Sequence, residues 1–232
     1  MCLTIKITQL VNNMEKLLHI ALISNIIFEP YFPPLIKQYF GGNTAIFPIP
    51  FGEHTEAEYQ TQVRSADLIV VWLNIEVLFP GQFYSLEKQD LDETIALCKK
   101  LYADLTSISH VKTLWFLFED YAIPLSAAVG HVYHDFADKL NLTLRDTLGN
   151  QVLFIDLKHL IAEVGIPNAY DSKGRYRWNA PYSKTLVEAA VREIHKQYLI
   201  EKGITKKCLV LDCDNVLWGG ILSEDGIENL KL

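Results

Sequence analysis

The sequence predicts a three-layer α/β/α fold around a mainly parallel β-sheet. Apolar runs alternate with amphipathic segments along the chain, and this order is typical of α/β domains. The apolar runs are continuous, as expected for strands that helices cover on both faces. The 232 residues are 50% hydrophobic and 21% charged. That length and composition suit one large or two small globular domains.

Six short apolar runs are the predicted strands. They span residues 17–24, 45–48, 68–72, 113–118, 152–156 and 208–211. The amphipathic segments between them predict helices, which span residues 33–39, 86–105, 125–142, 157–164 and 183–200. In residues 86–105 the apolar side chains recur every three or four positions and form one stripe. Residues 165–182 are polar and without periodicity, so we predict a long loop there.

The ends of the predicted helices divide the chain into three regions. The last long helix begins after Ser183, a good N-cap residue, and stops before Gly203. We therefore predict a lead of residues 1–14, an α/β domain of residues 15–203, and the start of a second domain at residues 204–232. Neither an internal repeat nor a low-complexity tract interrupts this organisation.

Charge and cysteine usage restrict the partners and the compartment. The net charge is −7, and no run of lysine or arginine is longer than a pair. This argues against nucleic acid, because phosphate neutralisation needs clustered cations. The four cysteines show no CxxC spacing, which favours a reducing compartment. The apolar run 17–28 has no cleavage site and is too short to span a bilayer. We expect a soluble, cytoplasmic protein that binds neither membrane nor nucleic acid.

The C-terminal stretch carries the most specific chemistry. Residues 207–220 are KCLVLDCDNVLWGG, in which an apolar strand leads into Asp212 and Asp214. Side chains two apart on an extended segment point to the same side, so both carboxylates can share one site. Paired carboxylates suit Mg²⁺ coordination and phosphoryl transfer, with one Asp attacking phosphorus and the other exchanging a proton. The alternative is a strand-ending acidic turn without chemistry.

This stretch resembles the first motif of the haloacid dehalogenase superfamily, and residues 217–226 resemble its FkbH-like branch, subfamily IIIC. The resemblance implies Asp212 as nucleophile and Asp214 as general acid/base, with both residues holding Mg²⁺. It further implies an enzyme that loads a glyceryl unit from 1,3-bisphosphoglycerate onto an acyl carrier protein and removes phosphate. The implied partners are that carrier protein and a phosphorylated three-carbon substrate. Val216 departs from the family, which usually has Thr there.

A complete phosphotransferase domain of this kind needs further strands, a Lys and a second acidic motif. Nothing follows Leu232 in the sequence. We therefore expect phosphotransfer to belong to a longer protein and this chain to be inactive alone.

FkbH-like proteins carry an SGNH-like domain ahead of the phosphotransferase domain, and residues 15–203 are similar to one. The first strand ends in Ser24, where SGNH enzymes place their nucleophile, and a later strand leads into Asn74, where they place an oxyanion donor. The DxxH element expected before the last helix is missing, since residues 171–183 contain no His. A hydroxyl without a base is a poor nucleophile, so we predict a degenerate SGNH site.

The remaining residues leave several alternatives open. Ser24 also suits plain turn chemistry before Asn25. We expect packing or surface roles for the histidines at positions 131, 134, 159 and 195. Arg175, Arg177, Trp178 and Tyr182 combine anion-pairing planes with aromatic surface, and the first three are candidates for binding the carrier or another anion. The alternative there is a solvated loop whose Trp plugs the domain.

Three hypotheses follow for function. The first is an FkbH-like glyceryl transferase, the second a non-catalytic SGNH-like module that binds a carrier protein, and the third an SGNH esterase with an unorthodox base.

Overall fold

The structure is a computed structural model that describes residues 17–29, 31–79, 87–120 and 132–204. The chain separates into two compact units, Met1–Tyr198 and Leu199–Leu232, and the second is described only to residue 204. The predicted lead, the predicted strand at 208–211 and the aspartates at 212 and 214 lie outside the described residues. The boundary after residue 203 therefore stays a prediction.

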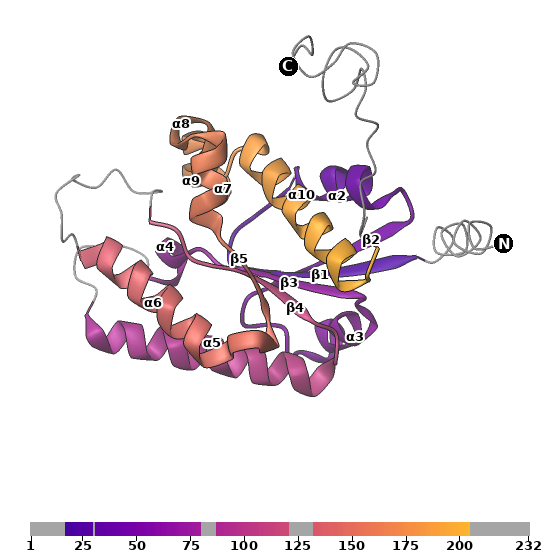
Figure 1. The fold of residues 1–232 in the computed structure, drawn as a ribbon, viewed down its shortest axis with the longest axis horizontal. Coiled ribbons are helices and arrows are strands. Elements are labelled where there is room, and N and C mark those ends of the chain that lie inside the picture. Colours follow the sequence, from indigo (N-terminus) through magenta and orange to yellow (C-terminus); the bar gives the residue numbers. More distant parts are fainter. Residues whose placement is uncertain (1–16, 30, 80–86, 121–131, 205–232) are drawn as a thin grey trace, which may run out of the picture. The chain divides into compact units, whose positions relative to one another are not determined.

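Five parallel strands form one sheet in the order β2-β1-β3-β4-β5 (Figure 1). They are β1 (Leu18–Ser24), β2 (Thr44–Pro50), β3 (Leu68–Trp72), β4 (Thr113–Phe116) and β5 (Leu153–Ile155). The prediction of a parallel sheet is confirmed. The chain runs from β1 to β2 on one side and then returns to β3 on the other. The carboxyl ends of β1 and β3 therefore meet at a switch point, where open α/β sheets place their sites.

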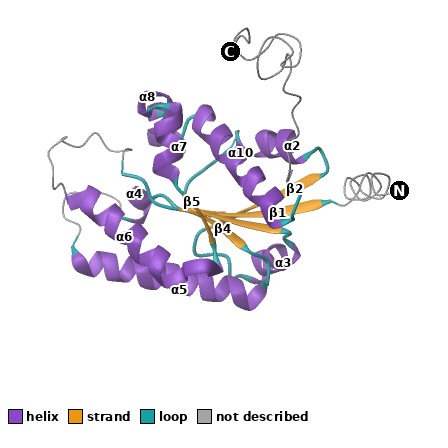
Figure 2. Cartoon of the chain, viewed as in Figure 1, coloured by secondary structure: helices purple, strands orange, loops and turns teal. Residues whose placement is uncertain are grey.

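Helices cover both faces of the sheet, which confirms the three-layer prediction (Figures 1 and 2). One face carries α2 (Phe32–Phe40), α7 (Leu157–Val164) and α10 (Lys184–Glu201). The other carries α3 (Ala57–Ser65), α5 (Lys88–Ile108) and α6 (Val132–Leu148). No helix of the described residues is long and apolar enough to cross a membrane.

The alternation of side chains along each strand builds two separate cores. In β1, Ile20 and Leu22 join the cluster under α2, α7 and α10, whereas Ala21 and Ile23 join the cluster under α3, α5 and α6. Successive side chains of a strand point to opposite faces, so a run that is apolar at every position buries both faces of the sheet. This is why the strands of the sequence are continuous apolar runs.

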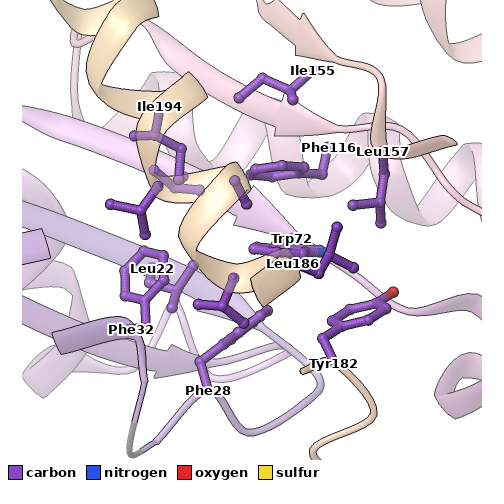
Figure 3. Packing of buried hydrophobic residues seen from close by; sticks show 14 of the residues in the cluster. Leu22, Phe28, Phe32, Trp72, Phe116, Ile155, Leu157, Tyr182, Leu186 and Ile194 are labelled. Atoms are coloured by element: carbon purple, nitrogen blue, oxygen red, sulfur yellow. The ribbon is translucent and has the colours of Figure 1, made fainter. Parts of the chain in front are cut away.

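Aromatic rings fill the first core near the carboxyl ends of the strands (Figure 3). Trp72, at the end of β3, stacks on Phe116 of β4 with ring centroids 4.1 Å apart. Phe28, from the segment after β1, lies 4.4 Å from the Trp72 ring, and Tyr182, from the segment before α10, lies 5.3 Å from it. Trp72 thus joins two strands to both of the segments that border the switch point.

Several predicted boundaries were wrong in detail. Helix α5 begins at Lys88, because the side chains of Glu87 and Asp90 cap its first turn. It continues to Ile108, three residues beyond the predicted end. Helix α6 continues to Leu148, and the predicted beginning at residues 125–131 lies outside the described residues. Helices α3 and α4 (Ile75–Leu78) were not predicted. Both are short and bury few side chains, so they have little apolar periodicity.

The prediction of a structureless loop at residues 165–182 was also wrong. Two short helices, α8 (Ile166–Ala169) and α9 (Ser172–Trp178), lie in this segment. Asp171 begins α9 by accepting hydrogen bonds from the backbone N–H groups of Lys173 and Gly174, at 3.0 and 2.9 Å. Because α9 buries only Gly174, local capping rather than an apolar stripe forms this helix.

Substitution of one buried and one exposed tryptophan tests the contribution of the aromatic core to stability. Trp72 is fully buried, whereas the Trp178 side chain is 67% exposed. We expect Trp72→Ala to lower the free energy of unfolding by about 3–5 kcal/mol, because it removes the ring against which Phe28, Phe116 and Tyr182 pack. Trp178→Ala should change it by less than about 0.5 kcal/mol. Urea denaturation of the two variants measures both values, and equal losses would contradict this account of the core.

Candidate functional site

Ser24 lies at the carboxyl end of β1, and its hydroxyl is engaged in its own turn. The Oγ atom accepts a hydrogen bond from the Ile26 N–H and donates one to the Ile26 carbonyl, both at 3.0 Å. The residue is buried. Among the described residues no side chain hydrogen-bonds to this hydroxyl. A serine nucleophile needs a base within hydrogen-bond reach, and here backbone atoms take that place.

Two asparagines join the ends of β1 and β3. The Asn25 Nδ2 atom donates to the Asn74 carbonyl at 2.8 Å, and the Asn74 N–H donates to Asn25 Oδ1 at 2.7 Å. The Asn25 amide therefore satisfies both backbone polar groups of Asn74, as a neighbouring strand would. This pair brings the two predicted SGNH positions, Ser24 and Asn74, to one place at the switch point.

The Asn74 side chain is itself used by the fold. Its Oδ1 atom accepts a hydrogen bond from the Val77 N–H at 3.3 Å and so caps α4. Its Nδ2 atom donates to the Tyr182 hydroxyl at 3.2 Å. An oxyanion donor must be directed at the position where charge develops on the substrate. In this structure the Asn74 amide is directed at a phenol of the protein.

A buried carboxylate continues this chain of hydrogen bonds. The Tyr182 hydroxyl donates to Glu119 Oε1 at 3.2 Å, and the Tyr170 hydroxyl donates to Glu119 Oε2 at 2.8 Å. Glu119 follows β4 and is only 3% exposed. A carboxylate removed from water is costly unless donors surround it, and the two phenols supply such donors. We call Asn25, Asn74, Glu119, Tyr170 and Tyr182 the buried polar centre.

Sequence reasoning missed most of the buried polar centre. Of its members, Asn74 was a candidate oxyanion donor, and Tyr182 was expected only as part of the aromatic surface of residues 165–182. Glu119 directly follows the predicted strand 113–118, and Tyr182 directly precedes the last predicted helix. Acidic and phenolic side chains at element ends were the available signal. Their partners are 51 and 63 residues away along the chain, however, and such pairing is visible only in three dimensions.

No histidine side chain of the described residues hydrogen-bonds to Ser24. His54 Nε2 pairs with Asp104 Oδ2 on α5 at 3.2 Å. His19, at the beginning of β1, faces the Ser65 carbonyl. The His195 ring packs edge-on against Phe40, and burial lowers the pKa of His195. His159 is exposed on α7. The residue at 131 and the side chain at 134 lie outside the described parts of the chain.

The three candidate anion-binding residues do not act together. Arg175 Nε donates to Glu76 Oε1 of α4 at 3.1 Å, its Nη2 contacts the same oxygen, and both side chains are largely buried. Arg177 is exposed, as is Trp178. The interpretation of Trp178 as a plug for the domain is therefore wrong. Its ring extends into solvent, because the side of α9 that faces the protein carries Gly174 and Arg175.

The described residues do not contain a metal centre. No group of three or more His, Cys, Asp or Glu side chains within them could hold a metal ion. Asp212 and Asp214, which the resemblance assigns to Mg²⁺, lie outside the described residues. Their fit to a metal ion therefore stays a prediction.

Comparison with known proteins adds information about the fold. No protein-family model matches the chain, and no curated protein sequence matches it. The chain is similar to the N-terminal part of the protein BF1531 from Bacteroides fragilis, a crystal structure that contains a phosphatase domain complexed with Mg. The TM-score is 0.68 at 17% identity, over 92% of this chain and 60% of that one.

Two hydrolases are also similar. The lipase Lip_vut3 from a goat rumen metagenome gives a TM-score of 0.52 at 16% identity, over 78% of this chain and 97% of that one. A catalytic mutant of Axe2, an acetylxylan esterase from Geobacillus stearothermophilus, gives 0.50 at 13% identity, over 80% and 94%. At these identities the likeness shows the fold alone. The described domain has the α/β fold of the SGNH-like hydrolases.

The hydrogen bonds of Tyr182 allow a direct test of the buried polar centre. We expect Tyr182→Phe to lower the free energy of unfolding by about 1–3 kcal/mol, because Asn74 Nδ2 and Glu119 Oε1 each lose a partner in a buried site. Tyr39→Phe is the matched control, since the Tyr39 hydroxyl makes a long, 3.4 Å contact with Glu188 near the surface. Chemical denaturation measures the free energy of unfolding of both variants. A Tyr182→Phe variant as stable as the wild type would contradict the stabilising role of the buried polar centre.

Proposed function

We propose that residues 15–203 form a non-catalytic SGNH-like module whose role is to bind a partner, an acyl carrier protein by resemblance. One observation carries this proposal. The two side chains at the positions of an SGNH nucleophile and oxyanion donor, Ser24 and Asn74, are committed to hydrogen bonds within the fold. Neither is directed at a substrate.

The segment before α10 supports the same proposal. An SGNH hydrolase has a DxxH element there, and this chain has Asn179 and Tyr182 at that spacing. Asn179 lies in the left-handed region with φ 53°, and its Nδ2 atom donates to the Asn25 carbonyl at 3.0 Å. An amide cannot take up a proton near neutral pH. The Tyr182 phenol gives its proton to the hydrogen bond with Glu119, so it cannot serve Ser24 as a base.

A serine-directed fluorophosphonate separates this module from an SGNH esterase. We expect no adduct on Ser24 after incubation of the chain at pH 8, because no side chain of the described residues activates its hydroxyl. Axe2 with its catalytic serine intact is the positive control, and Ser24→Ala is the matched variant. Peptide mass spectrometry locates any adduct. Labelling of Ser24, together with ester hydrolysis that Ser24→Ala abolishes, would establish the esterase hypothesis instead.

A second function is favoured by the C-terminal motif. We propose that a longer protein with a complete phosphotransferase domain is an FkbH-like glyceryl transferase that depends on Mg²⁺. The DxD motif within residues 207–220, at the end of a strand that the sequence predicts, supports this proposal. The likeness to BF1531 is compatible with it, since that structure contains a phosphatase domain complexed with Mg. In this proposal Asp212 attacks phosphorus and Asp214 transfers the proton.

Asp212→Asn tests the nucleophile assignment. In a protein that includes the complete phosphotransferase domain, we expect this variant to lose phosphate release from 1,3-bisphosphoglycerate by at least about 10³-fold, because an amide cannot form the acyl phosphate. Phosphate release and the mass of the carrier protein are the two readouts. Thermal denaturation should be unchanged in the variant. Turnover at the wild-type rate would remove Asp212 from the reaction.

A further inference from the structure

Helix α9 presents large side chains to solvent although its inner side is held firmly. The Tyr176 and Trp178 side chains are 84% and 67% exposed, the largest exposures among the big apolar and aromatic residues of the described chain. Lys173 and Arg177 are exposed beside them. Lys173, Tyr176 and Arg177 have the spacing of one helix face, and Trp178 follows at the end of the helix. We call these four residues the α9 surface.

Four contacts fix α9 to the rest of the domain. Asp171 caps its first turn, and Arg175 pairs with Glu76 of α4. Gly174 lies so close to the Ala180 carbonyl that an added Cβ would be 2.6 Å from that oxygen. After the helix, the Ile27 N–H donates to the Asn179 carbonyl at 2.9 Å. The exposed side chains therefore extend from a helix that does not have to be ordered when a partner binds.

The residue types of the α9 surface are those that dominate binding energy at protein interfaces. Tryptophan, tyrosine and arginine are enriched among interface residues whose loss costs most affinity. Stiff aromatic side chains on a fixed helix also lose little conformational entropy on binding. The fold itself does not need these rings, because α9 is held through Gly174 and Arg175 on its other side. The exposed aromatic area therefore has no evident structural role.

Charge indicates what the partner must carry. Helix α9 contains three basic residues and no acidic one, in a chain whose net charge is −7. Arg175 is neutralised by Glu76, whereas Lys173 and Arg177 form no ion pair with another described residue. A basic, aromatic patch on an acidic protein attracts a partner with acidic residues beside an apolar stripe and repels one that is basic.

We propose that the α9 surface is the docking site for an acidic helix of a partner protein. This rests on the proposed function of the module and assigns the surface through which it would bind. A seven-residue helix is about 10 Å long, so it matches a short stretch of a single helix rather than a broad interface. The contact is therefore of the weak, transient class, as suits a partner that must leave again.

Binding to a holo acyl carrier protein, used as the acidic helical probe, tests this surface in the 232-residue chain. Calorimetric titration should show that Trp178→Ala weakens binding at least about tenfold. Arg177→Glu should also weaken binding, and the loss should be larger at low salt than at high salt. Leu142→Ala is the matched control, since Leu142 is a 61% exposed apolar residue on α6, on the other side of the sheet. This control should bind like the wild type, and circular dichroism verifies each fold.

The outcomes separate the surface from the function of the module. Equal binding by all variants overturns the α9 surface and leaves carrier binding in place. Absence of binding by the wild type overturns both the surface and the carrier as partner. The non-catalytic assignment is tested separately, by the absence of fluorophosphonate labelling at Ser24. Sedimentation of the chain alone tests whether a second copy of the chain binds the α9 surface. A dimer that Trp178→Ala dissociates would overturn the proposal in favour of a second copy of this chain.

Discussion

The paired amide hydrogen bonds between Asn25 and Asn74 are the constraint on which the site of this protein depends. They hold the carboxyl ends of β1 and β3 together beyond the last residues of the sheet. Parallel strands of the order 2-1-3-4-5 leave a crevice at this position, where the connections depart in opposite directions. Here the crevice is bridged by side chains of the protein. These hydrogen bonds fix the position of Ser24 relative to Asn74.

The buried polar centre extends from that pair and joins segments far apart in sequence. Asn74 donates to Tyr182, and Tyr182 and Tyr170 both donate to Glu119. Because Glu119 would be costly to bury alone, the two tyrosines and the carboxylate depend on one another. The centre therefore holds the segment before α10 against the ends of β3 and β4. Aromatic packing also holds the segment before α10 against β3, since the Tyr182 ring stacks on Trp72.

Residues 165–182 contribute both to the buried polar centre and to the α9 surface. Residues 165–182 turn Tyr170 and Tyr182 inward and Tyr176 and Trp178 outward. The inward residues donate to Glu119, and the outward ones belong to a basic, aromatic surface. An exposed helix that is already fixed to the domain is suited to recognition, and this is the physical basis of the proposed module.

The sequence alone determined the layers of the fold, because apolar runs without alternation are buried on both faces wherever they pair. It also placed Ser24 and Asn74 at strand ends. Tertiary structure decided what those residues do, since the partners of Asn74 at positions 25 and 182 are 49 and 108 residues away. It likewise decided that Arg175 is paired with Glu76 while Trp178 is exposed. These outcomes depend on long-range contacts, whereas α9 is formed by the local Asp171 cap, and neither leaves a periodic signal in a sequence.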